Sequence, residues 1–277
     1  MKSQSNVVKT VLRILLLLVL LSPFILAWLP TDIFYGLVPE SASSQGYFID
    51  DGFLAQLASS FQDLTITLVV TMVFAMVLSL LLGYVSVWSM TFGRGLSNIL
   101  NAVESIPSIL VALFMYAPVS GFLASHGNDV SSIASLSVFV GAATLTALPE
   151  SVRSITIPLS DLYNRKYSIS FRSYGFPKGK ILAVLMNTGL MRNAVKRVAA
   201  GILLKTLVLD CSFGFIIQLG FGSNGTPAHL SPGALVATYR QSLMGIGSVM
   251  YFWLPTIMLV MISVAFLLVL NDVKEEL

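Results

Sequence analysis

The sequence predicts an all-α membrane protein with six membrane-spanning helices and with both ends of the chain in the cytoplasm. The first observation is composition: 56% of the 277 residues are hydrophobic and only 10% are charged, whereas a soluble protein carries about 25% charged residues. The second is a set of six apolar runs, each near the length of about 20 residues that a helix needs to cross a bilayer. The third is the distribution of Lys and Arg, which sets the direction of the spans.

The six apolar runs differ in their ends and in their polar residues. The apolar run of the first, residues 14–29, follows Lys2, Lys9 and Arg13 and so resembles a signal peptide, but it is long and no small-x-small cleavage site follows it directly. We therefore expect an uncleaved anchor. The third contains Pro107, which can kink a helix. The predicted spans cover residues 12–29, 64–88, 96–115, 131–148, 198–219 and 249–270.

The basic residues predict that both termini lie inside. With that orientation the inner segments hold 14 of the 16 Lys and Arg residues, while Arg240 lies outside and Lys205 falls within the fifth span. An excess of basic residues in cytoplasmic segments orients membrane proteins, and it accounts for the net charge of +3 without nucleic acid. The inner residues are Lys2, Lys9, Arg13, Arg94, Arg153, Arg165, Lys166, Arg172, Lys178, Lys180, Arg192, Lys196, Arg197 and Lys274.

Three segments between the spans are long. The outer segment 30–63 ends in an apolar–polar stretch that predicts a short interfacial helix leading into the second span. The outer segment 221–247 is rich in Gly and Pro and predicts turns followed by a short helix over about 234–243. The inner segment 150–197 mixes aromatic, apolar and basic residues. We expect short helices there, with a break at Gly175–Pro177, and a functional role.

The residue types present argue against several chemistries. Cys211 is the one cysteine, so no disulfide can form within the chain. His126 and His229 lie far apart in sequence, which argues against a zinc site. The stretch from Gly175 to Lys180 resembles a phosphate-binding loop, but its spacing is one residue short and no Ser or Thr follows. We therefore expect no catalysis, no cofactor and no metal on this chain.

A series of short motifs runs in order between about residues 50 and 245. They are FxxQLxxSF over 53–61, ESIPSIL over 104–110, ALPESVRS over 147–154, an inner loop with Tyr167, Arg172 and Gly175, and LGFG over 219–222. In this order and spacing they resemble the inner-membrane permease subunits of bacterial ABC importers, specifically the dipeptide/oligopeptide/nickel subfamily.

That resemblance implies the type I ABC importer permease fold and residence in the bacterial cytoplasmic (inner) membrane. It implies that the chain forms half of a translocation pore together with a second, homologous permease subunit. Two ATPase subunits, which carry the ATP and Mg²⁺, would bind from the cytoplasm. An extracytoplasmic substrate-binding protein would deliver cargo to the outer segments 30–63 and 221–247. Peptides are the first expectation for the cargo, followed by nickel or a metal–opine chelate.

The inner loop carries the residues that the resemblance assigns to docking of the ATPase. Aligned on the glycine, the family's Glu-Ala-Ala triplet is replaced here by 169–171, and its later Leu-Pro falls at 187–188. A short helix with apolar side chains can sit in a groove of a partner, and a glycine permits the turn after it. The open alternative is a basic loop that contacts lipid headgroups only. The docking residues are Tyr167, Ile169, Ser170, Phe171, Arg172, Tyr174 and Gly175.

Four polar residues in or near the spans are candidates for the translocation path. Lys205 and Asp210 lie within the fifth span, where charged side chains usually face the protein interior or a watery cavity. They are five residues apart and so lie on different helix faces; each could instead pair with another helix or a partner subunit. Glu104 could line a gate or cap a helix near the headgroups, and Gln218 could face the substrate.

Two other function classes remain open. A secondary transporter driven by an ion gradient would have an inverted repeat and ionisable residues at mid-membrane. We find no repeat, and Lys205 and Asp210 are the candidates for such residues. A non-transporting membrane scaffold would leave the inner segment 150–197 without a role in energy coupling.

Overall fold

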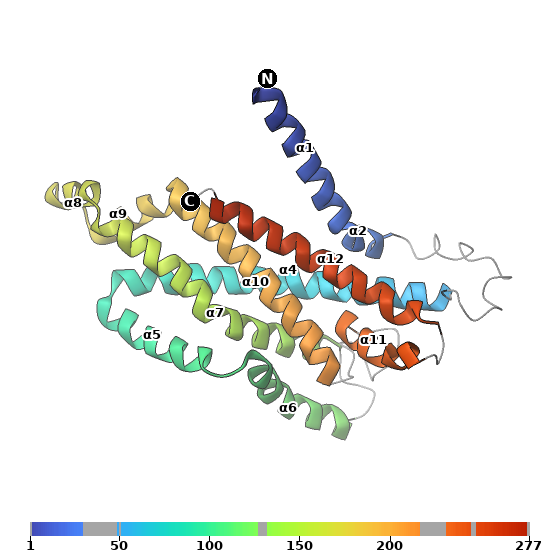
Figure 1. Cartoon of the computed structure of the whole chain (residues 1–277). Helices are drawn as coiled ribbons and strands as arrows, with labels where there is room; N and C mark the ends of the chain where they lie inside the picture. The colour runs from blue at the N-terminus through green and yellow to red at the C-terminus, as the bar shows by residue number, and fades with distance from the viewer. Residues whose placement is uncertain are drawn as a thin grey trace. The chain divides into compact units, whose positions relative to one another are not determined.

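The computed structural model describes residues 2–29, 49, 51–126, 132–216, 231–244 and 248–275, and these are almost wholly helical, with no strand among them. The predicted all-α class is confirmed. Within the described residues, Gly52–Trp88 and Met250–Val269 are helices long and apolar enough to cross a membrane. The first contains the whole of the second predicted span, 64–88, and the second matches the sixth, 249–270; such helices are typical of a membrane protein. The helices in Figure 1 are α1 (Lys2–Leu20), α2 (Ser22–Ala27), α4 (Asp51–Trp88), α5 (Met90–Glu104), α6 (Ser108–His126), α7 (Ser132–Asn164), α8 (Lys166–Ser173), α9 (Lys178–Met186), α10 (Gly189–Ile216), α11 (Pro232–Thr238), the 3₁₀ helix η5 (Tyr239–Met244) and α12 (Met250–Glu275).

The third predicted span is not one straight helix. Helix α5 ends at Glu104, α6 begins at Ser108, and the two are bent by 89° at the break between them. Pro107 lies in that break and has no N–H to donate to the preceding turn. The predicted span 96–115 therefore contains a sharp bend, which is typical of a broken span or a re-entrant loop.

Other element boundaries also differ from the predicted ones. The first predicted span is divided between α1 and α2, with Pro23 in the first turn of α2. The separate interfacial helix predicted before the second span is wrong, because α4 continues without a break over 38 residues. At about 1.5 Å per residue α4 is about 57 Å long, far more than the roughly 30 Å hydrocarbon core. Helices α7 and α10 likewise continue into the segment that was predicted as an inner loop.

Contacts divide the chain into two compact units, and the first contains residues 1–67, 122–136 and 210–266. Its aromatic centre is Phe53 of α4, whose ring centroid lies 5.3 Å from that of Tyr239 and 4.5 Å from that of Tyr251. The Tyr239 hydroxyl donates to Oε1 of Gln56 at 3.0 Å, which gives its polar end a partner.

Helix α11 of the first unit begins where the sequence provides a cap. The Oγ of Ser231 accepts a hydrogen bond from the N–H of Ala234 at 3.3 Å, and Pro232 occupies the first helical position. Serine at the cap and proline directly after it are both favoured at helix starts. Together α11 and η5 confirm the short helix predicted over about 234–243.

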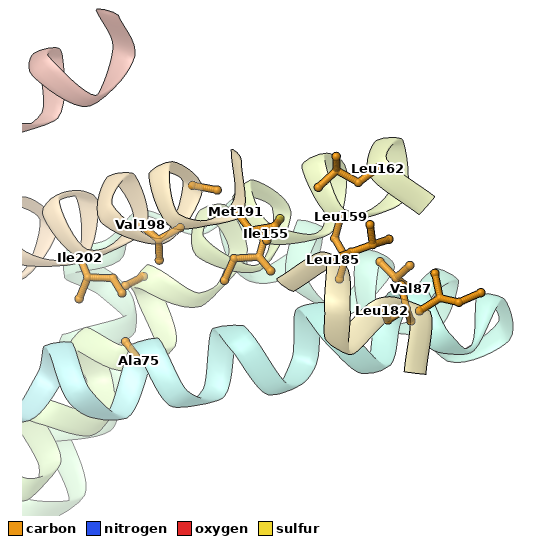
Figure 2. Close-up of a cluster of buried hydrophobic side chains, with 13 residues drawn as sticks. Ala75, Val87, Ile155, Leu159, Leu162, Leu182, Leu185, Met191, Val198 and Ile202 are labelled. Atoms are coloured by element: carbon orange, nitrogen blue, oxygen red, sulfur yellow. The ribbon is translucent and has the colours of Figure 1, made fainter. Parts of the chain in front are cut away.

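The second unit contains residues 68–121, 137–209 and 267–277, and its core joins α4, α7, α9 and α10. Figure 2 shows Leu182 and Leu185 of α9 close to Leu159 of α7, with Val87 of α4 beside them. Apolar residues three or four positions apart along α7 and α10 place their side chains on one face, which is why these helices pack there. The buried members are Ala75, Val87, Ala147, Ile155, Leu159, Leu162, Ile181, Leu182, Leu185, Met191, Ala194, Val198 and Ile202.

Candidate functional site

Helix α8, in the second unit, ends in a turn closed by two hydrogen bonds. The N–H of Gly175 donates to the carbonyl of Arg172 at 3.0 Å, and that of Phe176 to the carbonyl of Phe171 at 3.2 Å. This pair of bonds is the Schellman motif. Gly175 has φ of +79°, in the left-handed region that side chains resist. The rings of Phe171 and Phe176 meet edge to face at 5.9 Å. They supply the apolar contact that accompanies this motif.

The predicted break between the short helices is thus confirmed. Helix α8 ends at Ser173, and α9 begins at Lys178 directly after Pro177, which cannot continue a helix. Figure 1 shows α8 at the far end of α7, with α9 turning back from it.

The surface of α8 and of its closing turn is rich in exposed apolar groups. Ile169 is 51% exposed, Phe171 41% and Tyr174 81%. Ser170 is also exposed, and its hydroxyl bonds back to the backbone of its own helix. Tyr167 lies on α8, but its side chain is outside the described residues. Exposed apolar side chains of this kind suit a contact with lipid or with another protein.

Two cations fasten the α8–α9 turn to neighbouring helices around Tyr163 of α7. Nη2 of Arg172 donates to the Tyr163 carbonyl at 3.2 Å, and the guanidinium lies 4.6 Å from the ring centroid. Nζ of Lys178 lies 5.2 Å from the same centroid. It also donates at 2.8 Å to the carbonyl of Trp88, the last residue of α4. Such terminal carbonyls have no partner within their own helix, so Lys178 closes the end of α4.

A further bond joins α9 to α4. The Tyr84 hydroxyl donates to the carbonyl of Gly179 at 3.1 Å. With the apolar core around Leu182, it fixes the first turns of α9 against α4. The apolar surface of α8 is therefore connected to long helices through packed side chains and not through a loose loop.

Two ion pairs join α7 to its neighbours, one to α5 and one to α10. Nη2 of Arg153 on α7 donates to Oε2 of Glu104 at 3.0 Å and to Oδ1 of Asn101 at 2.8 Å. Nζ of Lys205 on α10 lies 2.7 Å from Oε2 of Glu150 on α7. All four charged side chains are 42–59% exposed. Ion pairs this exposed to water contribute about 0–1 kcal/mol each, so their charges stay available to other partners.

These pairs give two of the candidate path residues a partner within the chain. Lys205 pairs with another helix, and its place in the translocation path stays a prediction. Glu104 stands at the end of α5 and not at a helix start, so it does not cap one. Sequence reasoning missed their partners Glu150 and Arg153. The signal that could have found them is their position directly after the fourth predicted span, where α7 simply continues.

Asp210 is buried in the first unit, and Gln218 lies outside the described residues. Asp210 is 1% exposed, and neither carboxylate oxygen makes a hydrogen bond of normal geometry within the described part of the chain. The Ser231 hydroxyl and the Gly233 N–H nonetheless lie close enough to interact with it. A Cβ on Gly233 would stand 2.7 Å from Cα of Cys211, so glycine lets α11 lie directly on α10. No group of three His, Cys, Asp or Glu residues in the described ranges could hold a metal ion.

Comparison with known proteins adds one match. The family described as "Protein of unknown function (DUF4044)" matches residues 56–86, a segment that lies entirely within α4 and covers well under half of the chain. No curated protein matches the chain. The similarity therefore concerns one apolar helix and carries no activity with it.

Proposed function

We propose that this chain is the transmembrane permease subunit of an ATP-driven ABC importer and forms half of its translocation pore. The observation that carries the proposal is α8, a short helix with exposed Ile169, Phe171 and Tyr174. Arg172 bonds α8 to α7, and the following helix α9 is bonded to α4 through Lys178. An importer of this kind needs a rigid contact through which a cytoplasmic ATPase moves the membrane helices. The motif series that resembles the peptide and nickel permeases points the same way.

The contacts of α8 and α9 suit them to transmit force. A displacement of α8 acts on α9 through the Schellman turn, and α9 shares a packed core with α7, α10 and α4. Packed cores move between discrete arrangements and do not deform smoothly. A shift of α8 in an ATPase groove would therefore tilt the helices as bodies and alternate access to the pore.

The proposed partners follow from this role. A second, homologous permease subunit completes the pore, and the exposed pairs at Glu104 and Lys205 are candidates to line it or to meet that subunit. Two ATPase subunits carry ATP and Mg²⁺, and an extracytoplasmic binding protein delivers the cargo. The complex would reside in the bacterial inner membrane. Peptides remain the first cargo class, with nickel or a metal–opine chelate after them.

A secondary transporter is the second candidate, and the buried carboxylate of Asp210 is the observation that favours it. Intramembrane carboxylates serve as proton or ion sites in such proteins. The two proposals separate cleanly, because uptake by a secondary transporter stops when an ionophore collapses the ion gradient. Uptake by an importer of the ABC class stops when the ATPase is removed.

The ATPase contact is tested by co-purification from membranes of cells that express the tagged chain. The wild type should retain a subunit that hydrolyses ATP, and Phe171→Glu should lose most of it. Full burial of a phenylalanine contributes about 1.5–3 kcal/mol, which corresponds to roughly a ten- to hundredfold change in affinity.

The matched control is Val184→Glu on α9. Val184 is 57% exposed, so the same charge is placed on an exposed apolar site outside α8. It should retain the ATPase. Equal recovery of an ATPase with Phe171→Glu and with the wild type would refute docking through α8. Recovery of no ATPase by the wild type would count against the whole proposal.

A further inference from the structure

A basic cavity lies between α7 and α10 in the second unit and is separate from the apolar surface of α8. Its volume is about 440 Å³, within the range of about 300–1,000 Å³ that is usual for small-ligand sites. Three arginines, Arg153, Arg165 and Arg197, line it together with the apolar side chains of Ile157 and Leu190.

The charge of the basic cavity is not balanced by the residues around it. Asp161 is the one carboxylate in its lining. Within the described ranges the side chains of Arg165, Arg197 and Asp161 make no hydrogen bond or ion pair, and both polar contacts of Arg153 use Nη2. A guanidinium has five N–H donors in a planar fork that matches phosphate oxygens. Several donors at this cavity are therefore available to an anion.

The position of the basic cavity relates it to the inner face of the membrane. Arg153 lies five residues after the predicted end of the fourth span, and Arg197 lies one residue before the predicted start of the fifth. At about 1.5 Å per residue, both lie within about 8 Å of the predicted span ends, whereas Arg165 lies 17 residues after residue 148, about 25 Å along α7. The basic cavity therefore runs from the predicted headgroup level at Arg153 and Arg197 toward the cytoplasm at Arg165. The headgroup layer has a similar depth on each side of the hydrocarbon core. Ile157, which is 53% exposed, gives the cavity an apolar rim.

We propose that the basic cavity binds the phosphate group of an anionic ligand, with the headgroup of an inner-leaflet anionic phospholipid as its first source. Arg165 and Arg197 hold the phosphate oxygens, and Arg153 adds a donor while it keeps Glu104. Ile157 and Leu190 accommodate the apolar part of the ligand next to the phosphate. Basic pockets between helices at the cytoplasmic face are suited to such headgroups. The inference does not depend on the proposed transport function.

The test measures lipid binding by the full-length chain in detergent micelles, with native mass spectrometry as the readout. Phosphatidylglycerol and phosphatidylcholine are titrated separately, and inorganic pyrophosphate serves as the soluble phosphate probe. The test variant is Arg165→Gln with Arg197→Gln. The matched control is Arg94→Gln with Arg192→Gln, which removes the same charge from exposed arginines outside the cavity lining.

The wild type and the control should bind phosphatidylglycerol about tenfold or more tightly than the test variant does, and phosphatidylcholine should not show this difference. Arg165→Lys with Arg197→Lys should fall between them, because lysine keeps the charge and loses the fork. Competition by pyrophosphate that requires the same two arginines would assign the site to soluble phosphate compounds. Equal phosphatidylglycerol and pyrophosphate binding by the test and control variants would overturn the proposal.

Discussion

Replacing Gly175 by alanine should loosen α8 without disturbing the core of the second unit. Gly175 has φ of +79°, and a Cβ added there would meet nothing within 4 Å. The cost is therefore the intrinsic strain of a left-handed alanine, about 1–2 kcal/mol. Because the Schellman turn closes only in that conformation, the same free energy should favour states in which the end of α8 is open.

Hydrogen exchange followed by mass spectrometry measures those open states. Amides at the end of α8, including that of Phe176, should exchange about 5- to 30-fold faster in Gly175→Ala, the equivalent of about 1–2 kcal/mol. Gly175→Asn should exchange less rapidly than the alanine variant, since asparagine tolerates the left-handed region. Gly95→Ala is the control, because Gly95 lies in α5 with open space around it. Identical exchange in Gly175→Ala and the wild type would refute this account of the turn.

Three further predictions concern stability, each measured by thermal unfolding of the purified chain. Gly233→Ala should lower the free energy of unfolding by about 1–3 kcal/mol, since its Cβ would meet rigid backbone atoms at 2.7–2.9 Å. In the control Gly201→Ala the added Cβ has no neighbour within 4 Å, so this change should be neutral or stabilising. Equal changes in stability for the two variants would contradict the close packing of α11. Leu182→Ala should cost about 2–5 kcal/mol, because the side chain is 0% exposed in the core; a cost under about 1 kcal/mol would argue against α9 as an anchor. A double-mutant cycle on Lys205→Met and Glu150→Gln should give a coupling of about 0–1 kcal/mol, since both side chains are half exposed; a coupling of several kcal/mol would mean that the pair is enclosed.

The features predicted well from sequence are those set by local chemistry. Hydropathy over one window locates the second and sixth spans, which correspond to Gly52–Trp88 and Met250–Val269. The glycine and proline at 175 and 177 predict the break between α8 and α9, because they act on their own dihedral angles and hydrogen bonds. The short helix predicted over about 234–243 is likewise present, although α11 begins at Pro232, two residues earlier.

The features missed depend on residues distant in sequence. Pro107 predicts a kink, but the 89° between α5 and α6 depends on what each helix packs against. The partner of Lys205 is 55 positions away on α7, and no periodicity specifies it. The length of α4 was missed for a different reason. The composition changes from mixed to apolar near residue 64, which resembles the start of a helix, but α4 is continuous through this change. The three arginines of the basic cavity lie on α7, on α10 and between α7 and α8, and only the packing of these elements brings them together.

The central claim is that α8 contacts an ATPase, and crosslinking from α8 tests it most directly. A photoreactive amino acid is placed at Phe171 or, as the control, at Val184, and membranes are irradiated with the chain in its native complex. Position 171 should crosslink to a subunit that binds ATP, and position 184 should not. Crosslinks from Phe171 to lipid alone, with no ATP-binding subunit captured, would contradict the account and favour a loop that serves topology.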